Sequence, residues 1–391
     1  MHPLRVLYLM NGFAVGGPVG GAERFTISLA RALDRTKVTP MLAGLWQWDS
    51  PFEEQWRSEL RAEGQVTLVG PPKDVDAPLQ NLVGSIRALQ TQITTPVDVI
   101  HSQCDFGDLV AWVLNRRLHA KALVRTAHNE REWAKRPWRR FVFTNVLYPL
   151  IYDVELGVSQ KVVDNLDRRQ LARMCRRRGI VAYNALDFER FSNIERVDLA
   201  ARRRELGIPD NAYVVGTVSR LVRQKGIDVL LMAAGVVLAQ RSDTYFVIVG
   251  DGELADTLRE QARQLGIAER VFFAGARQNV EEILAVLDLF VSSSLWEGLP
   301  TVILEAMAAR VPIVATRVSG TVELLEDAVT GILVPPGEPA PLAAAILTSA
   351  EKTEFGRAMA ARAREHALAR FDIRAVARQH EEIYRLLTLA A

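Results

Sequence analysis

Short apolar runs alternate with longer amphipathic segments along the whole chain. The apolar runs predict buried strands, and the segments between them, in which apolar residues recur with helical spacing, predict helices. This alternation is typical of parallel α/β architecture. In the first half, the predicted strands cover residues 4–10, 38–45, 65–69, 97–102, 121–126, 153–158 and 180–183, and the predicted helices cover 21–34, 52–63, 78–91, 105–118, 129–148 and 159–168.

A second series of elements starts at residue 213. A polar and charged stretch at 186–210 separates the two series, and 391 residues exceed what one hydrophobic core usually supports. We therefore predict two doubly wound, Rossmann-like domains with ligands at the carboxyl ends of their strands, in a cleft between the domains. The predicted strands are 213–219, 244–250, 271–275, 288–293, 312–316 and 331–334. A helix is predicted after the first of them, ending near residue 240, and further helices are predicted at 253–265, 279–286, 301–309, 339–350, 354–370 and 373–388.

The composition, with 49% apolar and 24% charged residues, is that of a soluble globular protein. Two cysteines cannot make a disulfide framework, which fits a reducing cytoplasm. Arginine far outnumbers lysine, a bias typical of GC-rich bacterial genomes. No nucleic-acid-binding motif accompanies the basic residues, so nucleic acid is not an expected partner.

Basic residues gather in the first half although the net charge is only +2. The segment 133–152, WAKRPWRRFVFTNVLYPLIY, mixes Lys and Arg with Trp, Phe and Tyr. Such a helix is suited to peripheral contact with an anionic membrane and a lipid-linked acceptor. A buried helix with a basic start is the alternative.

Two glutamates in EGLPTVILE follow the predicted strand at 288–293. Glu305 stands among apolar residues, and ionised carboxylates are seldom buried without a partner. We expect Glu297 and Glu305 to accept hydrogen bonds from sugar and ribose hydroxyls. The backbone amides of Gly298–Thr301 open a helix and suit a phosphate. The alternative is ordinary helix-start charge.

Arg220 and Lys225, in VSRLVRQKGIDVL, follow the first strand of the second series. Arginine can bind two phosphate oxygens at once, and lysine supplies a compact charge. With the dipole of the next helix, this arrangement suits a diphosphate. Two solvent-facing basic residues in a loop are the alternative.

A glycine-rich segment, NGFAVGGPVGGAER, lies between the first predicted strand and the first helix. Consecutive glycines allow backbone N–H groups to approach an anion at a helix N-terminus. We therefore expect Gly20 and Gly21 to approach a ligand. A flexible surface loop is the alternative.

His128 lies just past the predicted strand at 121–126. It is a candidate donor to a sugar hydroxyl or an oxyanion, and a structural histidine is the alternative.

Two further patterns are weak. Gly250, Gly252 and Ala255 satisfy the G-x-G-x-x-A dinucleotide fingerprint, but they follow the second strand of their domain, and no ribose-binding acid follows at the expected place. Asp74 and Asp76 form a D-x-D pattern that can hold a divalent ion, but they lie far along the chain from the phosphate-binding features. No metal ion or other cofactor is therefore expected.

These motifs together resemble the GT-B glycosyltransferases, specifically the retaining glycosyltransferase family 4 (glycosyltransferase group 1). The resemblance is carried by GGAER, TAHNE, SRLVRQKG, VGDGE, the E-x7-E of SLWEGLPTVILEAMA, and the landmarks ELGVS and YNALD, and it covers nearly the whole chain. It implies an acceptor-binding domain at 1–190, joined by the final helix 373–391, and a nucleotide-sugar-binding domain at 191–372.

The resemblance also implies roles for single residues. The catalytic residues would be His128, Arg220, Lys225 and Glu297, with no metal ion. Arg220 and Lys225 would stabilise the departing nucleotide diphosphate, Glu297 would bind the transferred sugar, and His128 would face it. The donor-binding residues would be Gly20, Gly21, Arg220, Lys225, Gly250, Gly252, Gly298, Leu299, Pro300, Thr301 and Glu305.

The expected reaction is transfer of a hexose-type sugar from a UDP- or GDP-sugar to a glycan or lipid-linked acceptor, in bacterial cell-surface polysaccharide or glycolipid synthesis. Two alternatives stay open. One is a nucleotide-sugar epimerase or hydrolase on the same fold, and the other is a non-catalytic nucleotide-sugar-binding protein.

Overall fold

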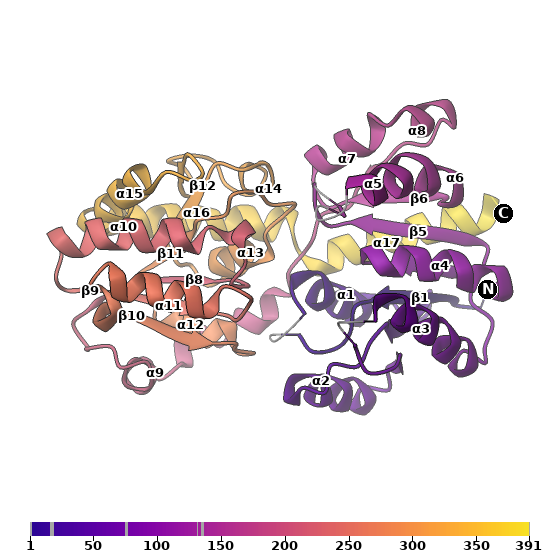
Figure 1. The fold of residues 1–391 in the computed structure, drawn as a ribbon, viewed down its shortest axis with the longest axis horizontal. Helices are drawn as coiled ribbons and strands as arrows, with labels where there is room; N and C mark the ends of the chain where they lie inside the picture. Colours follow the sequence, from indigo (N-terminus) through magenta and orange to yellow (C-terminus); the bar gives the residue numbers. More distant parts are fainter. Residues whose placement is uncertain (1, 16–18, 75–76, 131, 134–136, 391) are drawn as a thin grey trace. The chain divides into compact units, whose positions relative to one another are not determined.

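The computed structural model describes residues 2–390 except 16–18, 75–76, 131 and 134–136. It divides into two compact α/β units, one formed by Met1–Ala185 with Ile373–Ala391 and the other by Leu186–Asp372. Each unit contains a parallel sheet with helices on its faces (Figure 1).

The sheet of the first unit has the strand order β3-β2-β1-β4-β5-β6-β7, with all pairings parallel. Its strands are β1 (Leu4–Met10), β2 (Val38–Gly44), β3 (Val66–Val69), β4 (Val99–Ser102), β5 (Ala122–Ala127), β6 (Val154–Gly157) and β7 (Ile180–Val181). Its helices are α1 (Gly21–Ala32), α2 (Pro51–Ala62), α3 (Pro78–Gln92), α4 (Asp105–Leu118), α5 (Pro137–Arg140), α6 (Tyr148–Ile151), α7 (Gln160–Asp167), α8 (Gln170–Met174) and α17 (Ile373–Ala390), with a π-helical segment at Phe141–Leu147.

Both faces of this sheet are buried, because successive side chains of a strand point to opposite sides. Along β1, Val6 and Tyr8 belong to an apolar cluster that also contains residues of α1 and α17. Leu7 and Leu9 belong to a second cluster with residues of α3 and α4. The last helix, α17, packs on α1 and β5, so the end of the chain completes the first unit (Figure 1).

The sheet of the second unit has the order β10-β9-β8-β11-β12-β13 and is also parallel. Its strands are β8 (Tyr213–Val218), β9 (Thr244–Val249), β10 (Val271–Gly275), β11 (Leu289–Ser292), β12 (Ile313–Thr316) and β13 (Ile332–Val334). Its α-helices are α9 (Leu199–Glu205), α10 (Ile227–Gln240), α11 (Ala255–Gln264), α12 (Val280–Ala285), α13 (Thr301–Ala308), α14 (Ser319–Val322), α15 (Pro339–Glu351) and α16 (Thr353–Arg370).

The predicted fold class is confirmed, and each predicted strand is present within one or two residues of its predicted bounds. The predicted helix 129–148 is wrong at its start. Trp133 has a left-handed backbone (φ 52°), which a right-handed helix cannot accommodate, and the described helix begins only at Pro137. The short helices α8, α9 and α14 were not predicted.

The direction of strand order reverses in both sheets, between β1 and β4 in the first and between β8 and β11 in the second. In open α/β sheets, ligands bind outside the carboxyl ends of the strands at such a switch point. The glycine-rich segment follows β1, the segment with Arg220 and Lys225 follows β8, and the segment with Glu297 follows β11, so these three motifs lie next to the two switch points.

Candidate functional site

Three loops of the second unit leave the same edge of the sheet. They follow β8, β9 and β11, which are neighbours and run parallel, so their carboxyl ends lie side by side. Residues 219–226, 250–254 and 293–300 form these loops. The fold therefore gathers three motifs that are separated in the sequence.

The loops after β8 and β9 are held together by backbone hydrogen bonds. Leu221 N–H donates to the carbonyl of Asp251 (2.9 Å), and Leu254 N–H donates to the carbonyl of Leu221 (3.0 Å). Gly250 has φ 130°, and a Cβ atom there would lie 1.8 Å from the carbonyl oxygen of Ser219. A Cβ atom at Gly252 would lie 2.5 Å from the carbonyl oxygen of Leu221. Both glycines therefore allow one loop to pack closely on the other.

Arg220 is the second residue of the first of these loops. It is exposed, and its guanidinium has no hydrogen-bond or ion-pair partner in the part of the chain that the structure describes. An arginine side chain without a protein partner keeps all five N–H donors available to a ligand. The predicted role of Arg220 in holding a diphosphate stays a prediction.

Lys225 and Glu297 form an ion pair between the loops after β8 and β11. Glu297 is only 5% exposed, and its Oε1 atom accepts hydrogen bonds from Lys225 Nζ and from Ser294 Oγ, the latter at 2.7 Å. Gln224 Nε2 donates to Glu297 Oε2 at 3.3 Å and to the carbonyl of Trp296 at 2.9 Å. Pairing and hydrogen bonding offset the cost of burying the carboxylate.

Backbone contacts fix the same two loops. Leu295 N–H donates to the carbonyl of Gln224 (2.8 Å), and Ser293 Oγ donates to the carbonyl of Lys225 (2.9 Å). Gly226 has φ 58°, and a Cβ atom there would lie 2.3 Å from the carbonyl oxygen of Ser293. The position of Lys225 is thus set by its neighbours on both sides.

Glu305 lies on α13 and is 5% exposed. Arg190 lies between two acids, with Nη1 at 3.8 Å from Glu305 Oε1 and Nη2 at 2.9 Å from Glu281 Oε2. The contact with Glu305 is loose, so the carboxylate can accept further hydrogen bonds. Arg190 precedes Glu305 by more than a hundred residues and belongs to no short motif, so sequence reasoning did not find it.

The turn before α13 corrects one expectation. Pro300 is the N-cap residue of α13 and has no N–H, so it cannot supply one of the backbone donors expected from Gly298–Thr301. Gly320, after β12, packs against Gly298, because a Cβ atom at Gly320 would lie 2.2 Å from its carbonyl oxygen. Direct binding of the donor by Gly298, Leu299, Pro300 and Thr301 stays a prediction.

In the first unit, Gly20 and Gly21 open α1, as the sequence predicts. The carboxylate of Glu23 accepts hydrogen bonds from Gly20 N–H (3.1 Å) and from Asn11 Nδ2 (2.7 Å). The Gly20 amide is therefore occupied by a capping carboxylate, not open to an anion. The approach of Gly21 to a ligand stays a prediction.

His128 follows β5 and points one nitrogen at Gln103, which follows β4. The distance from His128 Nε2 to Gln103 Oε1 is 2.8 Å, and the buried Nδ1 atom has no partner within the described chain. Burial, with the nearby charge of Arg125, lowers the pKa of His128 to about 3. The imidazole is therefore neutral near pH 7, with a free acceptor nitrogen.

A buried network extends from Gln103 to α17. Gln103 Nε2 lies 3.1 Å from His101 Nε2, and His101 Nδ1 lies 2.7 Å from the hydroxyl of Tyr384. The hydroxyls of Tyr384 and Tyr8 are 2.8 Å apart. The last helix thus supports, through His101, the side chain that contacts His128.

Arg125 binds three carboxylates inside the first unit. Its guanidinium donates to Asp108 (3.0 Å), to Glu155 (2.7 Å) and to Glu132. Oxygen atoms of Asp105, Asp108 and Glu132 lie close enough together to resemble a metal site, and Arg125 pairs with two of these acids, Asp108 and Glu132. Asp76 of the D-x-D pattern lies outside the described residues.

Comparison with known proteins identifies this architecture. The sequence profile described as Glycosyltransferase Family 4 matches residues 19–190, and that described as Glycosyl transferases group 1 matches residues 200–366. The D-inositol 3-phosphate glycosyltransferase of Corynebacterium urealyticum is 30% identical over 337 residues, which cover 81% of this chain and 77% of the relative. The chain belongs to glycosyltransferase family 4.

Other comparisons agree with this family. The lipopolysaccharide core biosynthesis glycosyltransferase LpsE of Rhizobium meliloti is 34% identical over 178 residues, which cover 46% of this chain and 51% of the relative. The crystal structure of HepE from Anabaena in complex with UDP and glucose superposes with a TM-score of 0.80 at 24% identity, covering 97% of this chain and 99% of HepE. The fold is GT-B, and the protein is a glycosyltransferase, an enzyme of EC class 2.4.

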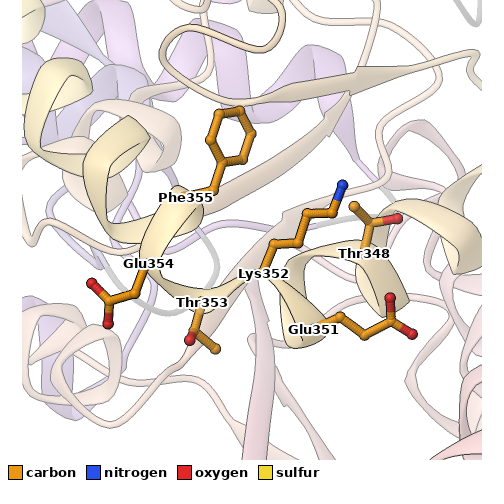
Figure 2. A pocket seen from close by; sticks show the side chains of 6 residues that line it. All are labelled: Thr348, Glu351, Lys352, Thr353, Glu354 and Phe355. Carbon is orange, nitrogen blue, oxygen red and sulfur yellow. The ribbon is translucent and has the colours of Figure 1, made fainter.

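Several features of this family 4 glycosyltransferase lie away from the motifs. A surface hollow at the junction of α15 and α16 is lined by Thr348, Glu351, Lys352, Thr353, Glu354 and Phe355 (Figure 2). None of these residues belongs to a motif, and all come from one helix–helix junction.

Among the described helices, none combines the length and the apolar character needed to cross a membrane.

Proposed function

We propose that this glycosyltransferase transfers a hexose-type sugar from a UDP- or GDP-sugar to a glycan or lipid-linked acceptor, with retention of the anomeric configuration and without a metal ion. The observation that supports this proposal best is the geometry after β8 and β11. Two features lie at this edge of the sheet. One is the guanidinium of Arg220, which has no partner in the described part of the chain, and the other is the ion pair between Lys225 and the buried Glu297. The UDP and glucose bound to HepE, a protein of the same fold, agree with it.

Arg220 and Lys225 would stabilise the charge that develops on the departing nucleotide diphosphate. In the described chain the Lys225 ammonium donates one hydrogen bond, to Glu297. Its other N–H groups are therefore available to phosphate oxygens. Fixed cations near a leaving group lower the barrier because they need no reorganisation during the reaction. The leaving phosphate would itself accept the proton of the attacking hydroxyl, since no side chain in the described chain is placed as a covalent nucleophile.

The two glutamates would hold the rest of the donor. Glu297 Oε2 has one long contact, with Gln224, and so has room for a sugar hydroxyl. Glu305 would accept hydrogen bonds from the ribose hydroxyls, in a position that Arg190 stabilises. The second unit would then bind the donor and the first unit the acceptor, with the neutral Nδ1 of His128 accepting a hydrogen bond from a hydroxyl.

The decisive experiment compares Arg220→Ala and Glu305→Ala with Arg357→Ala, which changes an exposed arginine on α16. Sugar transfer from a panel of UDP- and GDP-sugars is measured by release of the nucleotide. Removing a fixed cation from the reacting centre is expected to lower kcat/KM roughly 100-fold. Glu305→Ala should mainly raise the KM for the donor, and Arg357→Ala should match the wild type. Unchanged rates in both test variants would contradict the proposed site.

The alternatives are separated by omitting the acceptor. A nucleotide-sugar epimerase or hydrolase converts its donor without one, and proton NMR detects this conversion directly. A non-catalytic binding protein shows neither conversion nor transfer. We expect slow donor hydrolysis alone and rapid loss of donor when the acceptor is added.

We further propose that the first unit contacts an anionic membrane through residues 138–150. Trp138, Phe141 and Leu150 are 63%, 65% and 55% exposed and lie on α5, on the π-helical segment and on α6. Arg139 and Arg140 flank them. Exposed aromatic residues beside arginines suit the interface of a bilayer that contains anionic lipids.

Co-sedimentation with phosphatidylglycerol vesicles tests this contact. Binding should weaken as salt is raised and should fall in Phe141→Ser, whereas Leu386→Ser, which changes an exposed leucine on α17, should bind as the wild type does. Equal binding of both variants, or no dependence on salt, would exclude segment 138–150 as the membrane contact.

A further inference from the structure

Trp46, Trp48 and Lys73 gather at the carboxyl ends of β2 and β3. A backbone bridge brings the two loops together, because Gln47 N–H donates to the carbonyl of Pro71 and Lys73 N–H donates to the carbonyl of Gln47, both at 2.9 Å. This bridge places the lysine side chain beside the two tryptophans that flank Gln47.

The ammonium group of Lys73 lies on aromatic rings and has no acidic partner among the described residues. Its Nζ atom is 3.7 Å from the ring centroid of Trp48 and 5.0 Å from that of Trp46. In the same described part of the chain, no carboxylate pairs with it. Burial lowers the pKa of Lys73, and no neighbouring charge acts against this effect. A partly desolvated cation without a counter-ion is unfavourable unless a ligand supplies one.

The indole N–H of Trp46 also lacks a hydrogen-bond acceptor within the described chain. Trp46 is 4% exposed, and its Nε1–H has no acceptor among the described residues. Its ring packs edge-on against Phe106, with a centroid distance of 5.3 Å. Buried N–H groups without a partner are rare in native proteins because each one costs about 1–3 kcal/mol. Within the described chain, two neighbouring donors, one of them charged, therefore lack acceptors.

We propose that Lys73 and Trp46 form a subsite for a phosphate group of the acceptor substrate. A phosphate offers several acceptor oxygens and a negative charge, so it can satisfy the indole N–H and neutralise the ammonium together. A water molecule can accept hydrogen bonds from both groups but cannot neutralise the ammonium. The ring of Trp48, which is partly exposed, is left to contact the apolar or sugar portion that carries the phosphate.

This inference rests on the proposed function in one respect, since it takes the first unit to be the acceptor-binding unit. It adds a chemical class for the acceptor, a phosphate ester. The subsite lies after β2 and β3, whereas the proposed donor site lies after β8 and β11 of the other unit, so the two can be tested separately.

The test follows the indole N–H resonances of the ¹⁵N-labelled protein in the Arg220→Ala background, which weakens anion binding at the proposed donor site. Trp46→Phe identifies the Trp46 resonance among the seven tryptophans. Inorganic phosphate, inorganic pyrophosphate and phosphatidylglycerol in detergent micelles are titrated in turn. A saturable downfield shift of the Trp46 resonance is expected with the free anions if the site takes soluble phosphates, and only with the micelles if it takes a lipid head group.

Lys73→Met should weaken this binding at least tenfold, and Lys73→Arg should retain most of it. Lys121→Met provides the matched control, because Lys121 is an exposed lysine already paired with Asp98. A Trp46 resonance that does not move with any probe, or equal affinities of the wild type and Lys73→Met, would overturn the subsite. Because no donor or transfer reaction is involved, this failure is distinct from a failure of the proposed donor site.

Discussion

The amide oxygen of Gln103 lies 2.8 Å from Nε2 of His128 and can only accept a hydrogen bond. The proton of the neutral imidazole must therefore be on Nε2, which leaves Nδ1 as a lone-pair acceptor. Gln103 thus determines which hydrogen bonds His128 can make with a substrate. A histidine whose tautomer is fixed by its neighbour is a common arrangement at functional sites.

Replacing Gln103 is expected to change the protonation of His128. Gln103→Leu removes the acceptor, so the fixed tautomer is lost, and kcat should fall by up to roughly 100-fold through misplacement of the ring. Gln103→Glu keeps an acceptor and adds a negative charge, which raises the pKa of His128. ¹⁵N chemical shifts of the imidazole and the pH profile of transfer measure both effects. If Gln103→Leu leaves the His128 shifts unchanged, Gln103 does not set the tautomer.

Glu297 is expected to act through its charge as well as its shape. Glu297→Gln keeps a side chain that can hydrogen-bond to Ser294 but removes the partner of Lys225, so kcat should fall roughly 100-fold with little change in folding. Glu297→Ala should also lower stability, because it removes in addition the acceptor of the hydrogen bonds from Gln224 and Ser294. Steady-state kinetics and thermal denaturation give the two results. The matched control is Glu354→Gln, on α16, where the carboxylate is exposed.

Gly250 should not tolerate a side chain. Gly250→Ala would place a Cβ atom 1.8 Å from the carbonyl oxygen of Ser219 at a φ of 130°, so the loop that carries Arg220 must move. We expect a loss of about 1–3 kcal/mol in the free energy of unfolding and at least tenfold weaker donor binding. Gly235→Ala is the control, since nothing lies within 4 Å of the added atom and α10 gains helix propensity. Equal behaviour of the two variants would refute the packing role.

Arg125 is expected to be essential for the stability of the first unit. Arg125→Met leaves the buried Asp108 and the partly buried Glu132 without this cation, and leaves the buried Glu155 with Arg169 alone. Breaking a buried ion pair by removing one partner typically costs about 3–5 kcal/mol. Urea denaturation followed by circular dichroism measures the loss, with the exposed Arg357→Met as control. A loss below that of the control would show that the network contributes no net stability.

The first unit should lose stability in mild acid. Burial lowers the pKa of His380 to about 4 and that of His101 well below its usual value. Between the lowered pKa and the ordinary value near 6.5, the unfolded chain binds protons that the folded chain does not, so stability falls as the pH falls through this range. His380 alone should account for a loss on the order of 2 kcal/mol at pH 5.

His380→Gln isolates this contribution, because glutamine does not titrate. The free energy of unfolding, measured in urea at pH 7.5 and at pH 5, should fall less in His380→Gln than in the wild type. Taking the difference between the two proteins removes the contribution of buried carboxylates such as Asp108, whose raised pKa acts in the opposite direction. Identical pH dependence in both proteins would rule out His380 as a source of the acid sensitivity.

The fold could be predicted from the sequence because inner strands such as β11 and β12 are buried on both faces and therefore appear as apolar runs. Since the carboxyl ends of neighbouring parallel strands share one edge of a sheet, the predicted strand ends also bring Arg220, Lys225 and Glu297 to the same edge. The start of the helix at 129–148 could not be predicted, because the left-handed backbone of Trp133 leaves no signal in the apolar pattern.

The hydrogen-bond partners of the site residues also could not be predicted from the sequence. Gln224 and Ser294 are ordinary polar residues whose hydrogen bonds to Glu297 depend on the closure of two loops. The occupation of the Gly20 amide by Glu23 depends on the angle at which the chain enters α1. The contact between Gln224 and Glu297 joins residues 73 positions apart, and neither spacing nor composition reveals it.

The return of α17 to the first unit has a consequence for protein synthesis. Tyr384, which contacts His101 and Tyr8, leaves the ribosome only after the whole of the second unit. The amino-terminal unit therefore cannot complete its core until α17 has been synthesised, whereas Leu186–Asp372 is a continuous stretch that can fold as it emerges. A nascent chain arrested before residue 373 would expose the apolar surface of α1 that this helix covers.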